Sequence, residues 1–364
     1  MQTQILEAAR AFGVTGEPVS HSLIKTGNIN QTNLVKFSDG KEYIIQRVNT
    51  YVFRDPDGMM KNIAGVTAHL REKCREKGLD CRRQVLNFYS DGRGKLCHTL
   101  SDGSVWRMYD YIGNAVTYDS VPNTGLLTSA GAAFGNFAEM LADYDMAALV
   151  ETIPNFHDTQ KRYEAFEAAL DADRAGRAKD INIKTEIDYI KSQKQFCRKL
   201  TDMRKNGTLP VRVTHNDTKY NNVLIDITTQ MPAAIIDLDT VMPGLSAYDF
   251  GDAIRFAANT SLEDEPDTSK TSLSLEYYEA FAKGYVGVLR ESFNEAELMS
   301  LPTGALMMTV ELAIRFCTDY LSGDPYFKLN YPEHNLVRTR CQIALAKDIE
   351  KKFSNMEKII RKYM

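Results

Sequence analysis

The chain has 364 residues, and its 44 Lys and Arg against 48 Asp and Glu give a formal net charge of −4 at pH 7. Hydrophobic residues make up 43% of the chain and charged residues 25%, which is the composition of a globular protein of about two domains. The slightly acidic balance excludes a general polyanion binder, because nucleic-acid-binding surfaces are usually strongly basic. We therefore expect no nucleic-acid partner, whereas a local phosphate site that contains a metal ion remains compatible with this charge.

The sequence has no clear targeting or membrane signal. Its first residues mix Glu7 and Arg10 with apolar side chains, unlike a signal peptide. The most apolar segment, 301–317, is interrupted by Glu311 and Arg315, so we expect no membrane span. The six cysteines are scattered without a C-x-x-C pair, which is typical of reduced thiols. These features predict a cytoplasmic protein, and we expect a monomer.

Strand and turn patterns dominate the chain from about residue 19 to 112. Alternating apolar residues and Asp-Gly turns are typical of hairpins, whereas apolar residues spaced three or four apart indicate a helix. In chain order, the predicted elements are strands at 33–37 and 43–48 around an Asp-Gly turn, a helix at 59–77, hairpins around Asp91-Gly92 and Asp102-Gly103, and a strand at 105–112.

Helical patterns dominate the rest of the chain. The predicted helices span 126–144, 159–175, 185–206, 274–290 and 295–322. The sequence therefore predicts an α+β fold in which a small β-rich lobe precedes a larger, mainly helical lobe. We place the first lobe at 1–112 and the second at 113–364.

The strongest chemical signal is the spacing His215-x-Asp217-x4-Asn222, followed fifteen residues later by Asp237. An H-x-D sequence alone is also typical of a hydrogen-bonded turn. With Asn222 and Asp237 the spacing favours phosphoryl transfer, in which Asp217 orients a substrate hydroxyl and accepts its proton. Asn222 and Asp237 supply hard oxygen ligands, which suit Mg²⁺. Short apolar runs after Asn222 and before Asp237 predict a hairpin that brings these two residues together.

The segments His215-Asn-Asp217 and Ile236-Asp-Leu-Asp239 are similar to the catalytic and metal segments of the aminoglycoside phosphotransferase and choline kinase superfamily. This resemblance implies a protein-kinase-like two-lobe fold, with a nucleotide-binding lobe at 1–112 and a catalytic and substrate-binding lobe at 113–364. Longer stretches, including 242–244, 249–252 and 331–340, resemble the N-acetylhexosamine 1-kinases over about residues 20–350. They imply phosphorylation of the anomeric C1 hydroxyl of N-acetylglucosamine or N-acetylgalactosamine, with ATP as co-substrate and Mg²⁺ as cofactor.

The resemblance also assigns site residues. It implies Asp217 as the catalytic base in contact with the substrate, Asn222 and Asp237 as Mg²⁺ ligands, and Arg315 and Tyr326 as sugar contacts. Arg315 has a structural alternative, because a glutamate one helical turn earlier, at position 311, would pair with it.

Other conspicuous polar residues have structural interpretations. We expect Asp252 and Arg255, on the helix after the metal segment, to brace the active-site loops. His157-Asp158 is interpreted as a hydrogen bond at the start of a helix. The acidic run 263–267 is expected to be a solvated loop.

The nucleotide side departs from the usual kinase pattern. The candidate phosphate-covering loop, 27–32, has Gly27 but no G-x-G-x-x-G, and its Asn28 stands where we expect a histidine in the sugar kinases. Gln46 stands where a phosphate-binding lysine is expected. Two alternatives follow, since strand residues alternate between faces: Gln46 makes a neutral contact, or Arg47 reaches the phosphates through a bulge.

Asp110, Tyr111 and Ile112 are expected to form the hinge and to bind adenine through backbone groups. Two other functions remain open at this point. One is a kinase for another small alcohol, such as homoserine, choline or an aminoglycoside. The other is a nucleotide-binding pseudokinase, which Gln46 and the missing glycines favour and which the complete set of catalytic residues opposes.

Overall fold

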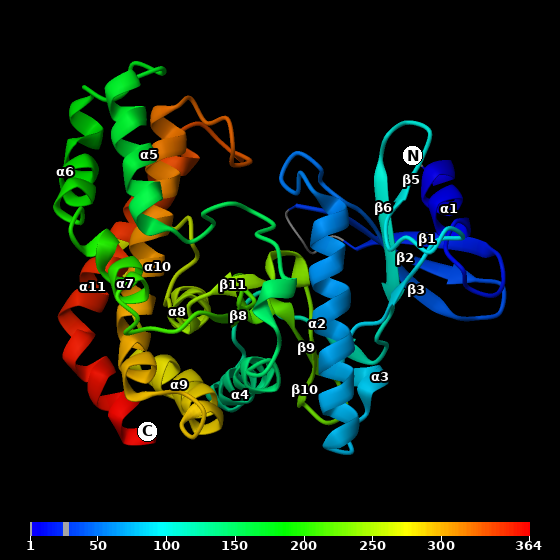
Figure 1. Cartoon of the computed structure of the whole chain (residues 1–364). Coiled ribbons are helices and arrows are strands. Elements are labelled where there is room, and N and C mark those ends of the chain that lie inside the picture. The colour runs from blue at the N-terminus through cyan, green and yellow to red at the C-terminus, as the bar shows by residue number, and fades with distance from the viewer. Residues whose placement is uncertain (1, 25–28) are drawn as a thin grey trace. The chain divides into compact units, whose positions relative to one another are not determined.

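The computed structural model describes residues 2–24 and 29–364. The chain forms two compact units, coloured along the chain in Figure 1. The first comprises Met1–Val116, Asp143–Pro154 and Leu224–Met242, and the second comprises Thr117–Ala142, Asn155–Val223 and Pro243–Met364. The units therefore interleave along the chain. The functional division proposed at residue 112 stays a prediction.

An antiparallel sheet forms most of the first unit, as the sequence predicted. Its strands are β1 (Pro18–Ile24), β2 (Gln31–Phe37), β3 (Glu42–Arg47), β4 (Phe88–Tyr89), β5 (His98–Thr99) and β6 (Val105–Asp110). The order is β1-β2-β3-β6-β4, with β5 also paired to β6. The predicted hairpin at 33–48 is β2 and β3, and its turn contains Gly40 at a φ of +84°. The hairpin predicted around Asp91-Gly92 is wrong, because β4 pairs with β6 instead.

The two faces of this sheet differ. One face packs against α1 (Gln2–Arg10), a helix that the sequence analysis did not predict, and their shared core includes Ile5, Phe37, Ile45 and Trp106. Because side chains alternate along a strand, Gln46 lies on the opposite face from Ile45. This second face carries Gln46, one of the predicted nucleotide contacts.

Two helices and a small sheet complete the first unit. The predicted helix at 59–77 is α2 (Pro56–Glu76), which Asp55 caps by accepting a hydrogen bond from the amide of Gly58 at 2.9 Å. It is followed by the short α3 (Cys81–Gln84). The small sheet contains β7 (Ala115–Val116), β9 (Val223–Asp226) and β10 (Pro232–Ile235), in the order β10-β9-β7. The hairpin predicted between Asn222 and Asp237 is thus confirmed as β9 and β10.

The second unit is mainly helical, which confirms the predicted contrast between the two parts of the chain (Figure 1). Its helices are α4 (Thr124–Met140), α5 (Thr159–Ala172), α6 (Lys184–Ser192), α7 (Lys199–Lys205), α8 (Ser246–Ala257), α9 (Leu275–Leu289), α10 (Glu295–Leu321) and α11 (His334–Tyr363). The single helix predicted at 185–206 is wrong, since it is divided into α6 and α7. Helix α11 was not predicted. A two-stranded sheet pairs β8 (Arg212–Thr214) with β11 (Met242–Gly244).

Helix α10 is long and apolar. By length and composition it could cross a membrane, but 94% of its apolar window is buried inside the structure, as in the core helix of a globular protein. It approaches α8 closely, because a Cβ atom on Gly304 would lie 2.0 Å from the carbonyl oxygen of Ala247. This contact fixes α8, whose polar residues face the candidate site.

Candidate active site

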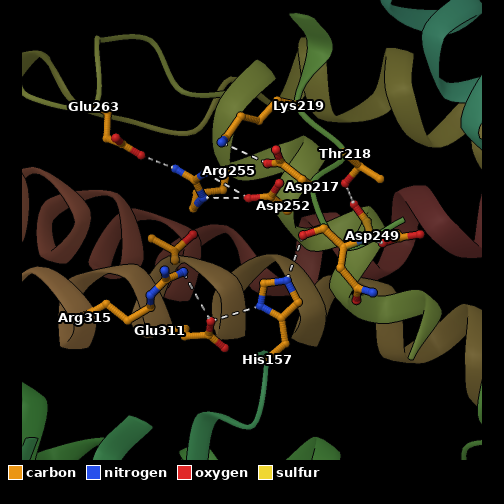
Figure 2. Close-up of polar contacts among 12 residues, drawn as sticks. His157, Asp217, Thr218, Lys219, Asp249, Asp252, Arg255, Glu263, Glu311 and Arg315 are labelled. Atoms are coloured by element: carbon orange, nitrogen blue, oxygen red, sulfur yellow. Dashed lines mark hydrogen bonds and ion pairs between the residues drawn. The ribbon is translucent and has the colours of Figure 1, made fainter. Parts of the chain in front are cut away.

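Asp217 follows β8 and lies in a loop that ends in the 3-10 helix Tyr220–Asn222. Lys219 Nζ is 2.9 Å from Asp217 Oδ1, and this ion pair is drawn in Figure 2. Asn222 Nδ2 donates to the Asp217 carbonyl at 2.8 Å and lies 3.2 Å from its carboxylate Oδ2. The structure therefore brings Asp217 and Asn222 together, as their spacing predicted. It also adds Lys219, which the sequence analysis missed although its position two residues after the aspartate was visible.

Asp249, in the first turn of α8, holds this loop through hydrogen bonds. Its carboxylate accepts the backbone amides of His215 at 2.9 Å and of Asn216 at 2.7 Å, and its carbonyl accepts the hydroxyl of Thr218. Asn216 has a φ of 62°, in the left-handed region that Asn tolerates better than most residues. Burial raises the pKa of Asp249. The loop that contains Asp217 is thus kept in an uncommon backbone conformation by a buried side chain.

The electrostatics around Asp217 favour its ionised form. Burial opposes that form, but the ammonium group of Lys219 outweighs burial and holds the pKa of Asp217 below its ordinary value. The same interaction raises the pKa of Lys219. The side chain of Asp217 is still 23% exposed, so it remains accessible to a small molecule. The pair can orient a hydroxyl group and place a positive charge beside it.

The donor atoms of Asn222 and Asp237 fit a hard cation. The amide nitrogen of Asn222 is used by Asp217, which leaves its carbonyl oxygen as the atom able to bind a metal. Asp237 follows β10 in the first unit and has a φ of 60°. Within residues 2–24 and 29–364, no group of three or more His, Cys, Asp and Glu is placed to hold a metal. Mg²⁺ does not need one, since it keeps several waters and binds substrate phosphates.

In the first unit, Gln46 is the centre of a polar ladder across three strands. Its amide nitrogen donates to the hydroxyl of Thr32 on β2 at 2.8 Å, and its oxygen accepts two hydrogen bonds from Arg107 on β6 at 2.9 and 2.7 Å. Gln46 is 9% exposed, whereas Arg47 is exposed. The register of β3 with β2 and β6 contains no shift, so the bulge proposed for Arg47 is wrong. Contact of either side chain with a nucleotide stays a prediction.

The segment after Asp237 is attached to this part of the unit at two points. Arg107 Nη1 lies 2.5 Å from Asp239 Oδ1, and Asn30 Nδ2 donates to the other carboxylate oxygen at 2.6 Å. Asn62 of α2 donates to the carbonyl of Val241 at 2.9 Å. These bonds hold Asp239 and Val241, which follow Asp237 closely in the chain. They explain how Asp237 keeps its left-handed conformation.

The predicted nucleotide contacts divide into two groups. Gly27 and Asn28 lie outside the described residues. At the hinge, Asp110 donates its amide to the carbonyl of Asn87 at 3.0 Å, so this group is already used. Among the described residues, no backbone hydrogen bond is formed at the exposed Tyr111 or the buried Ile112. Their backbone groups therefore remain the candidates for binding adenine.

Arg315 and Tyr326 lie close to one aromatic cluster in the second unit. The Arg315 guanidinium is 5.5 Å from the ring centre of Phe327 and 5.6 Å from that of Phe156. The ring of Tyr326, a half-exposed residue, is 4.8 Å from that of Phe327. The alternative pairing with Glu311 is weak, because the nearest nitrogen of Arg315 is 4.0 Å from its carboxylate.

Arg255 connects α8 to the acidic segment. It is buried and donates to Asp252 at 2.9 and 3.1 Å and to Glu263 at 2.7 Å, which is consistent with a bracing role (Figure 2). Asp264, next in the acidic segment, lies 3.0 Å from the buried His334. The expected solvated loop at 263–267 is therefore wrong in its first half, since Glu263 pairs with Arg255 and Asp264 with His334.

Comparison with known proteins adds a family and a fold. The model of the phosphotransferase enzyme family matches residues 21–285. An amicoumacin kinase in complex with AMP-PNP and Ca²⁺ has a TM-score of 0.63 at 15% identity, covering 96% of this chain and 93% of its own. A microcompartment-associated aminopropanol kinase scores 0.61 at 15% identity, with 98% of each chain covered. Spectinomycin phosphotransferase in complex with ADP and spectinomycin has a TM-score of 0.60 at 13% identity, covering 97% of this chain and 98% of its own. These similarities confirm the predicted kinase-like α+β fold.

Proposed function

Because this chain belongs to the phosphotransferase enzyme family, we propose that it transfers the γ-phosphoryl group of ATP to the C1 hydroxyl of an N-acetylhexosamine. The arrangement of Asp217, Lys219 and Asn222 carries the proposal of phosphoryl transfer, since an ionised carboxylate, a cation and an amide oxygen meet in one loop. The resemblance of longer segments to the N-acetylhexosamine 1-kinases supports the sugar. The ADP and AMP-PNP bound by two structural neighbours support ATP as the donor.

In the proposed reaction, Asp217 accepts a hydrogen bond from the C1 hydroxyl and takes its proton. The sugar oxygen forms a bond to the γ-phosphorus while the bond from that phosphorus to the β-phosphate oxygen breaks and ADP leaves. Lys219 keeps Asp217 ionised and stabilises the charge on the transferring group. When bound through Asn222 and Asp237, Mg²⁺ neutralises negative charge on the phosphates.

The charges beside Arg315 support a neutral acceptor. Arg162 of α5 donates to the carbonyl of Phe156 at 2.7 and 3.2 Å, and its pKa is lowered first by burial and next by the positive charge of Arg315. Two nearby guanidinium groups repel a cationic alcohol, whereas their N–H groups suit carbonyl and hydroxyl oxygens. This arrangement favours an N-acetylated sugar over choline or an aminoglycoside.

A kinase for amino alcohols is the second candidate. One structural neighbour is an aminopropanol kinase and another is a spectinomycin phosphotransferase, so this fold accommodates amine-bearing acceptors. The cations at Arg162 and Arg315 oppose such a substrate here. The two candidates differ in the charge of the acceptor, which makes them separable by one experiment.

The experiment measures ADP formation by the purified chain with ATP, Mg²⁺ and a panel of acceptors. The panel contains N-acetylglucosamine, N-acetylgalactosamine, the methyl glycoside of each, homoserine, choline and an aminoglycoside. We expect turnover with the free sugars and none with the methyl glycosides, in which the C1 oxygen is blocked. Turnover confined to amine-bearing alcohols would replace the sugar by the second candidate. Nucleotide binding with no acceptor-dependent turnover would favour a pseudokinase.

A further inference from the structure

His157 contacts the catalytic loop from a position sixty residues earlier in the sequence. It precedes α5 and is 7% exposed. Its Nε2 lies 3.0 Å from the carbonyl oxygen of Asn216, the residue before Asp217, and its Nδ1 lies 3.0 Å from Glu311 Oε1 on α10. Figure 2 shows the imidazole between these two partners. The hydrogen bond expected for His157-Asp158 at the helix start is confirmed, because Asp158 accepts the amide of Lys161 at 3.0 Å.

The two partners of His157 determine its protonation. A carbonyl oxygen and a carboxylate oxygen only accept hydrogen bonds, and a neutral imidazole has only one N–H group to donate. With Glu311 ionised, both contacts are therefore hydrogen bonds only when the ring is an imidazolium. Glu311 is completely buried and accepts a further hydrogen bond from the hydroxyl of Thr159 at 3.1 Å, as expected of a carboxylate. The geometry thus describes a buried ion pair that touches the catalytic loop.

We propose that His157 is a positioning residue: its imidazolium joins the backbone of the catalytic loop to Glu311 and so holds Asp217 in place for phosphoryl transfer. The inference rests on the proposed role of Asp217 as base, but it does not depend on which alcohol is the acceptor. Loss of the proton would remove one of the two hydrogen bonds of the ring and weaken its hold on the loop. His157 therefore couples the proton concentration to the rate of the chemical step.

The surroundings of His157 favour its charged form. Burial opposes the charge, but the carboxylate of Glu311 outweighs burial and raises the pKa of His157 above its ordinary value of 6.5. In turn, burial opposes ionisation of Glu311, but the imidazolium lowers the pKa of this carboxyl. The other charged and titratable groups around the pair are Arg162 on α5, Arg315 on α10, and Tyr248, Asp249 and Asp252 on α8.

The first test is the protonation state itself, measured by NMR on the full chain labelled with ¹⁵N-histidine, without substrate. The His157→Gln variant assigns the signal by its disappearance. We expect both ring nitrogens of His157 to carry protons at pH 7, above the ordinary pKa of histidine. A neutral ring with one unprotonated nitrogen at this pH would overturn the proposal. This measurement does not use activity, so its failure is distinct from a failure of the proposed function.

The second test compares kcat across pH for the wild type and His157→Gln, with whichever alcohol the wild type phosphorylates. Glutamine retains N–H donors but cannot hold the charge. We expect kcat to fall about 10- to 100-fold, as displaced catalytic groups usually cost, with little change in the KM for ATP. In the wild type, kcat should decline as the pH rises through the pKa of His157, which lies above 6.5. This decline of kcat should be absent from the variant. An unchanged kcat, or the same alkaline decline in both proteins, would contradict the proposal.

A control uses His69, a partly exposed histidine that also faces a carboxylate. His69 Nε2 lies 2.9 Å from Asp143 in the first unit, and its side chain is 20% exposed. His69→Gln should leave kcat and its pH dependence unchanged. If it reproduced the effects of His157→Gln, the role assigned to the catalytic loop would be wrong. If His157→Gln folds poorly, side-chain correlation spectra of the uniformly labelled wild type assign the His157 signal instead, so its protonation state still decides the matter.

Discussion

Arg107 and Asp239 form an ion pair inside the first unit, with 2.5 Å between Nη1 and Oδ1 and with side chains only 2% and 3% exposed. Protein kinases place a lysine of the third strand opposite a helix glutamate and an aspartate of the metal segment. Here the third strand has Gln46, whose oxygen holds the guanidinium of Arg107 instead. The buried cation here is therefore Arg107, which lies on the neighbouring strand β6 and stabilises the segment that follows Asp237.

Asp239→Ala should destabilise the protein strongly. The substitution leaves Arg107 buried without a counter-charge, which costs about 3–5 kcal/mol for a broken buried pair. Asp202→Ala is the matched control, because Asp202 pairs with Arg198 at 3.6 Å with both side chains about half exposed. We expect the control to change stability by less than about 1 kcal/mol. Denaturation in guanidinium chloride measures the free energy of unfolding of both variants. Equal losses of stability in Asp239→Ala and Asp202→Ala would refute the structural role of the buried pair.

Asp217→Asn should reduce kcat by roughly 10²–10⁴-fold, the usual contribution of a general base. The amide can still accept a hydrogen bond from the substrate, but it cannot take a proton. Nucleotide affinity, measured by isothermal titration calorimetry, should change little, because the variant retains Asn222 and Asp237. A kcat near that of the wild type would show that another group accepts the proton.

Gly304→Ala should destabilise the second unit and lower kcat. Its Cβ would lie 2.0 Å from the carbonyl oxygen of Ala247, so α10 and α8 must separate. We expect a cost of about 1–3 kcal/mol, typical of overpacking, and a displaced Asp249. Gly287→Ala is the control, since Gly287 is an exposed residue of α9 and nothing lies within 4 Å of its added Cβ. That variant should gain roughly 0.5–1 kcal/mol in thermal or chemical unfolding, and a loss there would contradict the packing argument.

The buried pair of His157 and Glu311 predicts how stability depends on pH. The raised pKa of His157 gives stability that is complete below pH 6.5 and is lost as the pH rises through the pKa of His157 in the folded state. The lowered pKa of Glu311 gives stability that is complete above pH 4.5 and is lost as the pH falls through the pKa of Glu311 in the folded state. The stability difference between wild type and His157→Gln should therefore be largest between pH 4.5 and 6.5. Urea unfolding at several pH values measures it, and a difference that grows above pH 6.5 would have the wrong sign.

Local patterns in the sequence predicted much of the fold and the centre of the site. The alternation around the Asp-Gly turn at 38–41 predicted β2 and β3, because a hairpin is determined by neighbouring residues. The spacing of Asp217 and Asn222 predicted their contact for the same reason, since both lie in one short loop. Lys219 belongs to the same segment and was missed only because its spacing was not interpreted.

Contacts between distant segments were not predictable in this way. Gln46 meets Arg107 because β3 pairs with β6, an arrangement that the order of the strands along the chain does not give. His157 and Glu311 are 154 positions apart, so nothing in either segment indicates their pairing. Helix α11 was missed although its apolar residues have helical spacing, whereas no glycine or proline marks the break between α6 and α7.

The most direct test of the proposed sugar 1-kinase is NMR of the product formed from ATP and N-acetylglucosamine or N-acetylgalactosamine. A ³¹P–¹H correlation spectrum identifies the proton that is coupled to the new phosphorus. The account predicts a correlation to the anomeric proton, formed by the wild type and not by Asp217→Asn. A phosphorus coupled to any other sugar proton, or no sugar phosphate from a chain that phosphorylates an amino alcohol, would contradict it.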